Sequence, residues 1–121
     1  MPELPEVETI VNDLRPNLAG RRITDITISW PRMVLQPSAE ELQQRLRGQV
    51  IKEIGRRGKY LIVRLASGEV LILHLRMTGS LLLRQKSDKN HPPVPYVTAL
   101  FRLDDGTELV FTDRRKLGTV S

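Results

Sequence analysis

Residues 50–75, VIKEIGRRGKYLIVRLASGEVLILHL, decide the fold class of this chain. Three apolar runs, 50–56, 59–65 and 70–75, are separated by a Gly58-Lys59 turn and by the turn Ala-Ser-Gly-Glu at 66–69. Short runs rich in Val, Ile and Leu between glycine-containing turns are typical of β-strands. The stretch therefore predicts consecutive strands.

The same pattern continues on both sides of this stretch. Alternating apolar residues predict a half-buried strand over 22–30, with Ile26, Ile28 and Trp30 on one face. We expect further strands over 80–84, 96–103 and 109–112, with a turn at 104–106. Residues 85–95 are polar and contain three prolines, so they predict a mobile loop.

Two helices complete the predicted architecture. Pro5 suits a first helical turn, and a stripe of apolar residues follows at helical spacing: Val7, Ile10, Val11 and Leu14. We expect this helix to end near Arg15, because Pro16 disfavours helical geometry before it.

Ser38 and Glu41 form a capping box for a second, shorter helix that Gly48 closes. The predicted fold is mainly β with flanking helices: a two-sheet β-sandwich with an N-terminal helix and a second short helix.

Composition limits the classes of protein that this chain can represent. Its 121 residues fit one domain, and 40% hydrophobic with 27% charged residues is ordinary for a globular chain. The absence of cysteine excludes a disulfide framework and a zinc finger within these residues. No signal peptide is recognisable and no apolar run approaches membrane-spanning length, so we expect a cytoplasmic protein with no membrane partner.

The charge pattern favours a polyanionic partner. The net charge is +5, and basic residues gather in 56–59, 84–89 and 114–116, each beside a turn or a strand end. The first and third clusters contain no acidic residue. Nucleic acid is therefore the favoured partner, with a merely solvated basic face as the alternative.

The first six residues, MPELPE, suggest covalent chemistry. Once Met1 is removed, Pro2 is a secondary α-amine with the carboxylate of Glu3 beside it. An α-amino group has a pKa of about 7.7–8.0, against about 10.4 for lysine, so far more of it is unprotonated near neutral pH. Such an amine is well suited to attack carbon. The alternative is that the hexapeptide merely begins a helix.

Four blocks together resemble one family. Residues 2–9, 58–61, 74–81 and 112–118 are similar, in order and spacing, to the bacterial formamidopyrimidine-DNA glycosylases. The related endonuclease VIII branch usually has glycine where this chain has Leu4, so the first branch is the better match. The resemblance implies base-excision DNA repair by a bifunctional glycosylase and AP lyase, a hydrolase and lyase acting on 8-oxoguanine and formamidopyrimidines in damaged double-stranded DNA.

The resemblance also implies catalytic roles. Pro2 would attack C1′ of the flipped nucleotide and form a Schiff base, Glu3 would act as the acid/base, and Glu6 would be a supporting polar group. Lys59 would reach the phosphates beside the lesion, and His74 would contact phosphate. Their alternatives are a solvated turn lysine and a satisfied histidine at a strand end.

Three residues would fill the space that a flipped nucleotide leaves: Met77, Arg115 and Leu117. Core packing is the alternative for Met77. The family usually has phenylalanine where this chain has Leu117, so we expect weaker stacking. Some members have proline where this chain has Arg114, so we expect added phosphate binding from a less rigid loop.

Family members are about twice as long, with a helical domain and a zinc finger after this region. We therefore expect 1–121 to be the N-terminal catalytic β-sandwich domain. We expect it to have no cofactor of its own, because the absent finger binds the family's zinc. We also expect no obligate protein partner. Loss of phosphate contacts predicts weak, strongly salt-dependent DNA binding. Two alternatives remain: a non-catalytic DNA-binding module of the same fold, for example with Met1 retained, and an unrelated basic β-domain that binds RNA.

Overall fold

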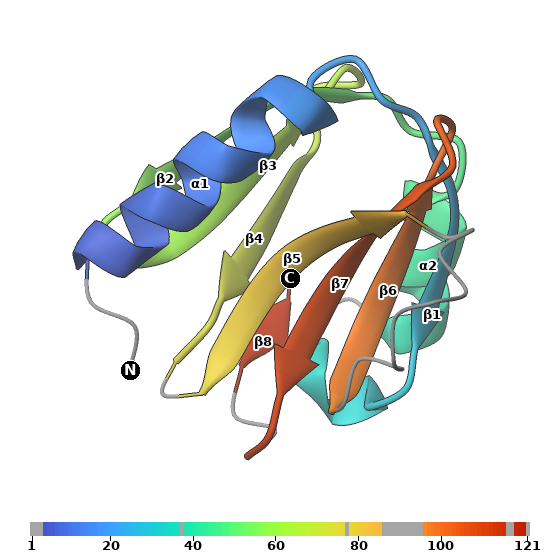
Figure 1. Cartoon of the computed structure of the whole chain (residues 1–121). Coiled ribbons are helices and arrows are strands. Elements are labelled where there is room, and N and C mark those ends of the chain that lie inside the picture. The colour runs from blue at the N-terminus through green and yellow to red at the C-terminus, as the bar shows by residue number, and fades with distance from the viewer. Residues whose placement is uncertain (1–3, 37, 77, 86–95, 116–117, 121) are drawn as a thin grey trace.

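The computed structural model describes residues 4–36, 38–76, 78–85, 96–115 and 118–120. Its elements, shown in Figure 1, are α1 (Leu4–Leu18), β1 (Ile23–Ile28), the 3-10 turn η1 (Pro31–Met33), α2 (Ala39–Leu46), β2 (Ile51–Arg57), β3 (Tyr60–Leu65), β4 (Val70–His74), β5 (Gly79–Gln85), β6 (Val97–Leu103), β7 (Thr107–Asp113) and β8 (Thr119–Val120).

The strands form two four-stranded antiparallel sheets, in the orders β1-β6-β7-β5 and β2-β3-β4-β8. Aliphatic and aromatic residues from both sheets and both helices make one buried core between them. The sheets meet at one corner, where Ile23 N–H donates to the Gln49 carbonyl and Ile51 N–H donates to the Arg21 carbonyl, each over 2.8 Å. This arrangement confirms the predicted sandwich with two flanking helices.

Helix α1 packs mainly on β2, with Val7, Val11 and Leu14 of its predicted apolar stripe buried and Ile10 partly buried. The predicted end at Arg15 is wrong, because the helix continues through Pro16 to Leu18. A proline in the last turn removes one backbone hydrogen bond, and the carbonyl that it leaves unpaired belongs to the exposed residue Asn12. Burial of Leu18, which is 0% exposed, accompanies this extension of the helix by one turn.

Helix α2 begins as the capping box predicts. The Ser38 side chain accepts a hydrogen bond from the Glu41 N–H over 3.2 Å, and Leu42 and Leu46 pack into the core. Gly48 has φ +88°, the left-handed conformation that glycine adopts after a helix.

Three differences between the predicted and observed strands exceed one residue, and the other strand boundaries agree to within one residue. The first strand is shorter than 22–30, because the chain turns into η1 after Ser29. Strand β7 begins two residues earlier than predicted, and the two-residue strand β8 was missed. Most of the predicted loop over 85–95 lies outside the described residues, and Gln85 itself ends β5.

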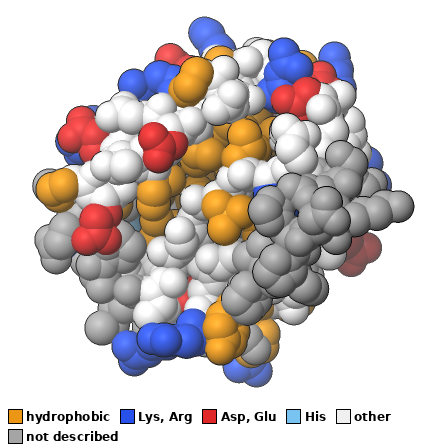
Figure 2. All heavy atoms as spheres, viewed as in Figure 1, with side chains coloured by type: hydrophobic (Ala, Val, Ile, Leu, Met, Phe, Trp, Pro, Cys, Tyr) orange, Lys and Arg blue, Asp and Glu red, His pale blue; other side chains and the backbone are white. Residues whose placement is uncertain are grey.

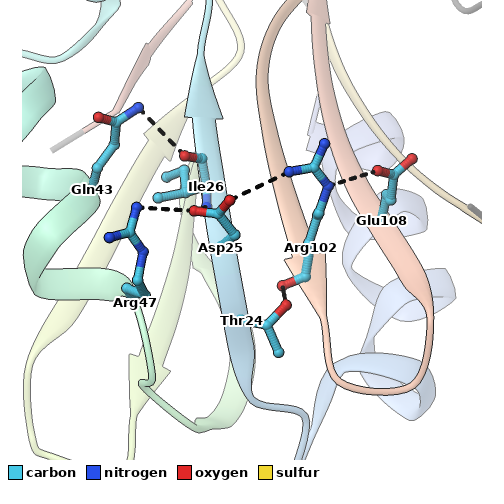
Figure 3. A network of polar contacts seen from close by, with 7 residues as sticks. All are labelled: Thr24, Asp25, Ile26, Gln43, Arg47, Arg102 and Glu108. Carbon is cyan, nitrogen blue, oxygen red and sulfur yellow. Dashed lines mark hydrogen bonds and ion pairs between the residues drawn. The ribbon is translucent and has the colours of Figure 1, made fainter.

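A row of alternating charges crosses the first sheet (Figure 3). Asp25 on β1 pairs with Arg102 on β6, which pairs with Glu108 on β7, and these residues are also cross-strand neighbours. Arg47, the C-cap residue of α2, reaches Asp25 over 3.0 Å, and Arg84 of β5 reaches Glu108 over 3.1 Å. The row joins α2 to all four strands, and Glu108 is only 5% exposed.

Candidate nucleic-acid interface

Segments far apart in sequence meet at one edge of the sandwich. Strand register pairs Tyr60 with His74, His74 with Thr119, and Gly79 with Asp113. The described residues of 57–60, 74–79, 112–115 and 118–119 therefore share this edge, which we call the common edge. In Figure 1 it is the end of the molecule where β5 begins and β7 ends.

The beginning of α1 lies toward the same edge. Glu8 Oε1 is 3.7 Å from Arg56 Nη2, next to the end of β2, whereas Arg15 Nε donates to the Ile54 carbonyl over 3.3 Å. The helix thus runs antiparallel to β2, with its first turn directed toward the Gly58-Lys59 turn. Glu6 is exposed in that first turn.

Two of the predicted DNA-contact residues are brought together here. Lys59 occupies the turn between β2 and β3, and Gly58 before it has φ +59°, which explains the glycine. His74 ends β4 and is 9% exposed, with its ring 4.5 Å from the ring of Tyr60, centroid to centroid. Lys59 also acts on His74 electrostatically.

Burial and the charges of the edge favour the neutral form of His74. Burial lowers the pKa of His74 below its usual 6.5, and the positive charges of Arg76 and Lys59 lower it further. A neutral imidazole surrounded by cations gains affinity for a proton when an anion arrives, because the anion favours the charged ring.

Asp113 ties two segments of the edge together, and the sequence argument assigned it no role. Its carboxylate is 1% exposed and accepts hydrogen bonds from the Thr78 hydroxyl and from the backbone N–H groups of Arg115, over 3.1 Å, and Gly118. The segment after β7 is thereby held against the segment before β5. Arg115 itself is exposed at this edge.

Arg76 is a second functional candidate that the sequence argument missed. It is exposed on the common edge and has φ +54°, a left-handed conformation that is uncommon for residues other than glycine. It lies inside a matching sequence block, but only the strand register places its charge beside His74.

Basic side chains outnumber acidic ones around the common edge. In the same view as Figure 1, Figure 2 shows Lys and Arg side chains along the lower rim, where β5 begins and β7 ends. The described basic residues at or next to the edge are Arg56, Arg57, Lys59, Arg76, Arg114 and Arg115. Of the nearby acids, Glu8 is paired with Arg56, and Asp113 is buried among hydrogen-bond donors.

Four predicted site residues, Pro2, Glu3, Met77 and Leu117, lie outside the described residues. Within the described part of the chain, no group of three or more His, Asp or Glu side chains is arranged to hold a metal ion. No helix among the described residues is long and apolar enough to cross a membrane.

Comparison with known proteins matches nearly the whole chain. Residues 1–120 match the model of the formamidopyrimidine-DNA glycosylase N-terminal domain. The chain is 44% identical over 119 residues to the formamidopyrimidine-DNA glycosylase of Protochlamydia amoebophila, covering 98% of this chain and 42% of that protein. Its identity to the Bacillus subtilis enzyme is 40% over 121 residues, again covering 42% of the relative.

Solved structures agree with the sequence relatives. The Lactococcus lactis enzyme in complex with DNA containing FAPY-dG has a TM-score of 0.87 and 37% identity, covering 98% of this chain and 43% of that one. The same enzyme with DNA containing an abasic site gives a TM-score of 0.85. The chain spans less than half the length of the relatives it matches. Both sequence and fold therefore show that this chain, which matches the model of the N-terminal domain, belongs to the formamidopyrimidine-DNA glycosylase family.

Proposed function

We propose that this chain is the catalytic domain of a base-excision repair enzyme, a bifunctional DNA glycosylase and AP lyase acting on oxidised purines such as 8-oxoguanine and formamidopyrimidines. The observation that supports the proposal is the common edge, which Lys59, His74 and Arg115 share and toward which the start of α1 is directed. Solved relatives with this fold are bound to FAPY-dG DNA and to abasic-site DNA.

In the proposed reaction, Pro2 is the nucleophile once Met1 has been removed. Its neutral nitrogen attacks C1′, and the damaged base leaves with the electron pair of the glycosidic bond and takes up a proton. The nitrogen, now positively charged, loses the proton that it carried as an amine. Glu3 protonates the ring oxygen, the sugar opens, and an iminium links Pro2 to C1′. Because a secondary amine gives a cationic iminium without an added proton, the C2′ proton becomes acidic. Its removal expels the 3′ phosphate, and a second elimination expels the 5′ phosphate.

Lys59 and His74 are assigned to the phosphates beside the lesion. The ammonium of Lys59 is held in a tight turn at the common edge, and phosphate binding at His74 is favoured by uptake of a proton. Glu6, exposed in the first turn of α1, is a supporting polar group. Arg76 is assigned as a further phosphate contact, because it has a positive φ and residues with strained backbones are common at functional sites.

Met77, Arg115 and Leu117 are assigned to the gap that the flipped nucleotide leaves. Removing a nucleotide from the stack costs about a few kcal/mol, and inserted side chains recover part of this free energy. The guanidinium of Arg115 can donate hydrogen bonds to the unpaired base, whereas Met77 and Leu117 supply apolar contacts.

The remaining parts of the proposal concern the longer protein. The relatives extend well beyond this chain, and we infer that a helical domain and a zinc finger in the remainder complete the grip on DNA. The protein would act in the bacterial cytoplasm, at the nucleoid. Because the 121-residue chain would make fewer phosphate contacts than the longer protein, it would bind DNA weakly and with a steep dependence on salt.

Borohydride trapping tests the proposed chemistry. The chain is incubated with duplex DNA containing an abasic site and reduced, so that an iminium becomes a stable covalent bond. We expect a cross-linked band with the mature chain and a strongly reduced one with the chain that retains Met1, in which the Pro2 nitrogen is an amide. Binding to the duplex without a cross-link in the mature chain would instead support a non-catalytic DNA-binding module.

A further inference from the structure

We propose that Thr78 and Asp113 are positioning residues for lesion recognition, acting through Arg115. They join the segment before β5 to the segment after β7, so that Arg115 is presented in one fixed orientation to the gap in the duplex. This inference rests on the function proposed above and extends it to residues that contact no DNA themselves.

The first support is a closed set of hydrogen bonds. The Thr78 hydroxyl donates to Asp113 Oδ1 and accepts from the Arg115 N–H over 3.3 Å. The same N–H also donates to Asp113 Oδ1 over 3.1 Å, and Gly118 N–H donates to Asp113 Oδ2. Thr78 and Asp113, which are 35 positions apart, thus both accept from the one backbone N–H of Arg115.

The second support is burial of the charge at the centre. Asp113 is 1% exposed, so its carboxylate depends on these donors in place of water. Thr78 supplies the one side-chain hydroxyl among the contacts named here, and the other donors are backbone groups. Loss of one donor leaves a buried charge partly unsatisfied, and this free-energy cost favours rearrangement of the segment after β7.

The third support is steric. A Cβ on Gly79 would overlap the Leu75 carbonyl oxygen, and a Cβ on Gly118 would lie 2.5 Å from Cζ of Phe111 and 3.0 Å from Asp113 Oδ2. Phe111 is 0% exposed and has no room to move away. Glycine at 118 therefore allows the segment after β7 to approach Asp113 closely, and glycine at 79 allows the chain to pass close to Leu75 as it enters β5.

A fixed backbone matters because Arg115 is long and exposed. Ordering a long side chain and a loose loop on binding costs conformational entropy, and a loop that is already ordered avoids part of that cost. The benefit is specific to duplexes with a gap, because contacts with phosphates alone do not require Arg115 to enter the stack.

The test compares Thr78→Val, which lacks the hydroxyl, with Thr78→Ser, which keeps it. Affinities of the 121-residue chain are measured for a duplex containing tetrahydrofuran, a stable abasic-site analogue, and for the intact duplex. We expect Thr78→Val to lower the ratio of tetrahydrofuran-duplex affinity to intact-duplex affinity about tenfold, with the intact duplex bound as by wild type. We expect Thr78→Ser to keep the wild-type ratio. Asp113→Asn, which replaces one acceptor by a donor, gives a second variant with the same expected loss.

A double-mutant cycle with Arg115→Ala separates positioning from a general structural role. If Thr78 acts through Arg115, Thr78→Val lowers the affinity ratio in the wild-type background and has little further effect in the Arg115→Ala background. An equal loss in both backgrounds overturns the inference, as does equal weakening of both duplexes. A wild-type ratio that Thr78→Val and Asp113→Asn leave unchanged also overturns it.

The outcomes distinguish this inference from the function on which it rests. Wild type that binds the tetrahydrofuran and intact duplexes equally well contradicts the proposed function, and the inference falls with it. A second outcome contradicts the positioning role only. In it, wild type prefers the tetrahydrofuran duplex and is trapped by borohydride, but Thr78→Val and Thr78→Ser have the same affinity ratio.

Discussion

The imidazole of His74 lies against the phenol ring of Tyr60, its cross-strand partner, with ring centroids 4.5 Å apart and planes inclined by 35°. Tyr60 is half exposed, and it covers a histidine that would otherwise meet water at the strand end. The contact keeps His74 largely desolvated beside Lys59 and Arg76, so the neutral ring is favoured until an anion binds.

DNA binding should therefore be coupled to proton uptake. The free chain has a lowered pKa at His74, and a bound phosphate raises it, so affinity should increase as the pH falls from about 7.5 to about 6. Calorimetry in two buffers of different ionisation enthalpy measures the uptake. His74→Gln should reduce it, whereas His91→Gln removes the other histidine and serves as the control; uptake unchanged in His74→Gln would refute the phosphate contact.

The same lowered pKa predicts how stability depends on pH without DNA. The unfolded chain binds a proton at His74 near pH 6.5, whereas the folded chain binds it only at lower pH. The contribution of His74 to the free energy of unfolding is therefore complete above pH 6.5 and declines as the pH falls toward the lower, folded pKa. Urea titrations across this range should show a smaller decline for His74→Gln, and an identical decline in both chains would contradict the assignment.

Lys59→Ala should weaken binding to every duplex and flatten the salt dependence. Each phosphate contact contributes about −0.9 to the slope of log affinity against log salt concentration, so losing one should change the slope by about 1. Lys52→Ala is the matched control, because Lys52 is exposed near the opposite end of β2. Equal slopes for the two variants would show that Lys59 contacts no phosphate.

Glu108→Gln should destabilise the fold by about 1–3 kcal/mol, because the buried carboxylate accepts from Arg84 and pairs with Arg102. Glu53→Gln is the control, since Glu53 and its partner Arg64 are both more than half exposed and their ion pair spans 3.5 Å. An exposed pair of this kind contributes about 0–1 kcal/mol. Equal midpoints of chemical unfolding for the two variants would contradict a structural role for the charge row.

The fold could be predicted from sequence where the determinants are local. Hydrophobic spacing and the Ser38 cap located both helices, and glycine-containing turns located most strands. The end of α1 was mispredicted, because burial of Leu18 is a tertiary effect that outweighs the local effect of Pro16. Strand β8 was missed because two residues carry no periodicity, and it is defined by pairing with β4.

The candidate site divides in the same way. Lys59 and His74 belong to sequence blocks that resemble the family, and the register of β3 and β4 brings them together. The roles of Asp113 and Thr78 could not be predicted, because their hydrogen bond depends on the pairing of β5 with β7. The charge of Arg76 is visible in the sequence, but its positive φ and its position beside His74 are not.

The most direct test of the central claim is the position of the covalent bond. After borohydride reduction with abasic-site DNA, the cross-linked chain is digested with protease and nuclease, and the peptide carrying the sugar remnant is identified by mass spectrometry. The account predicts that the remnant lies on the nitrogen of Pro2, in a peptide that has lost Met1. A remnant on Lys59 or another lysine, in a mature chain with an unmodified Pro2, would contradict it.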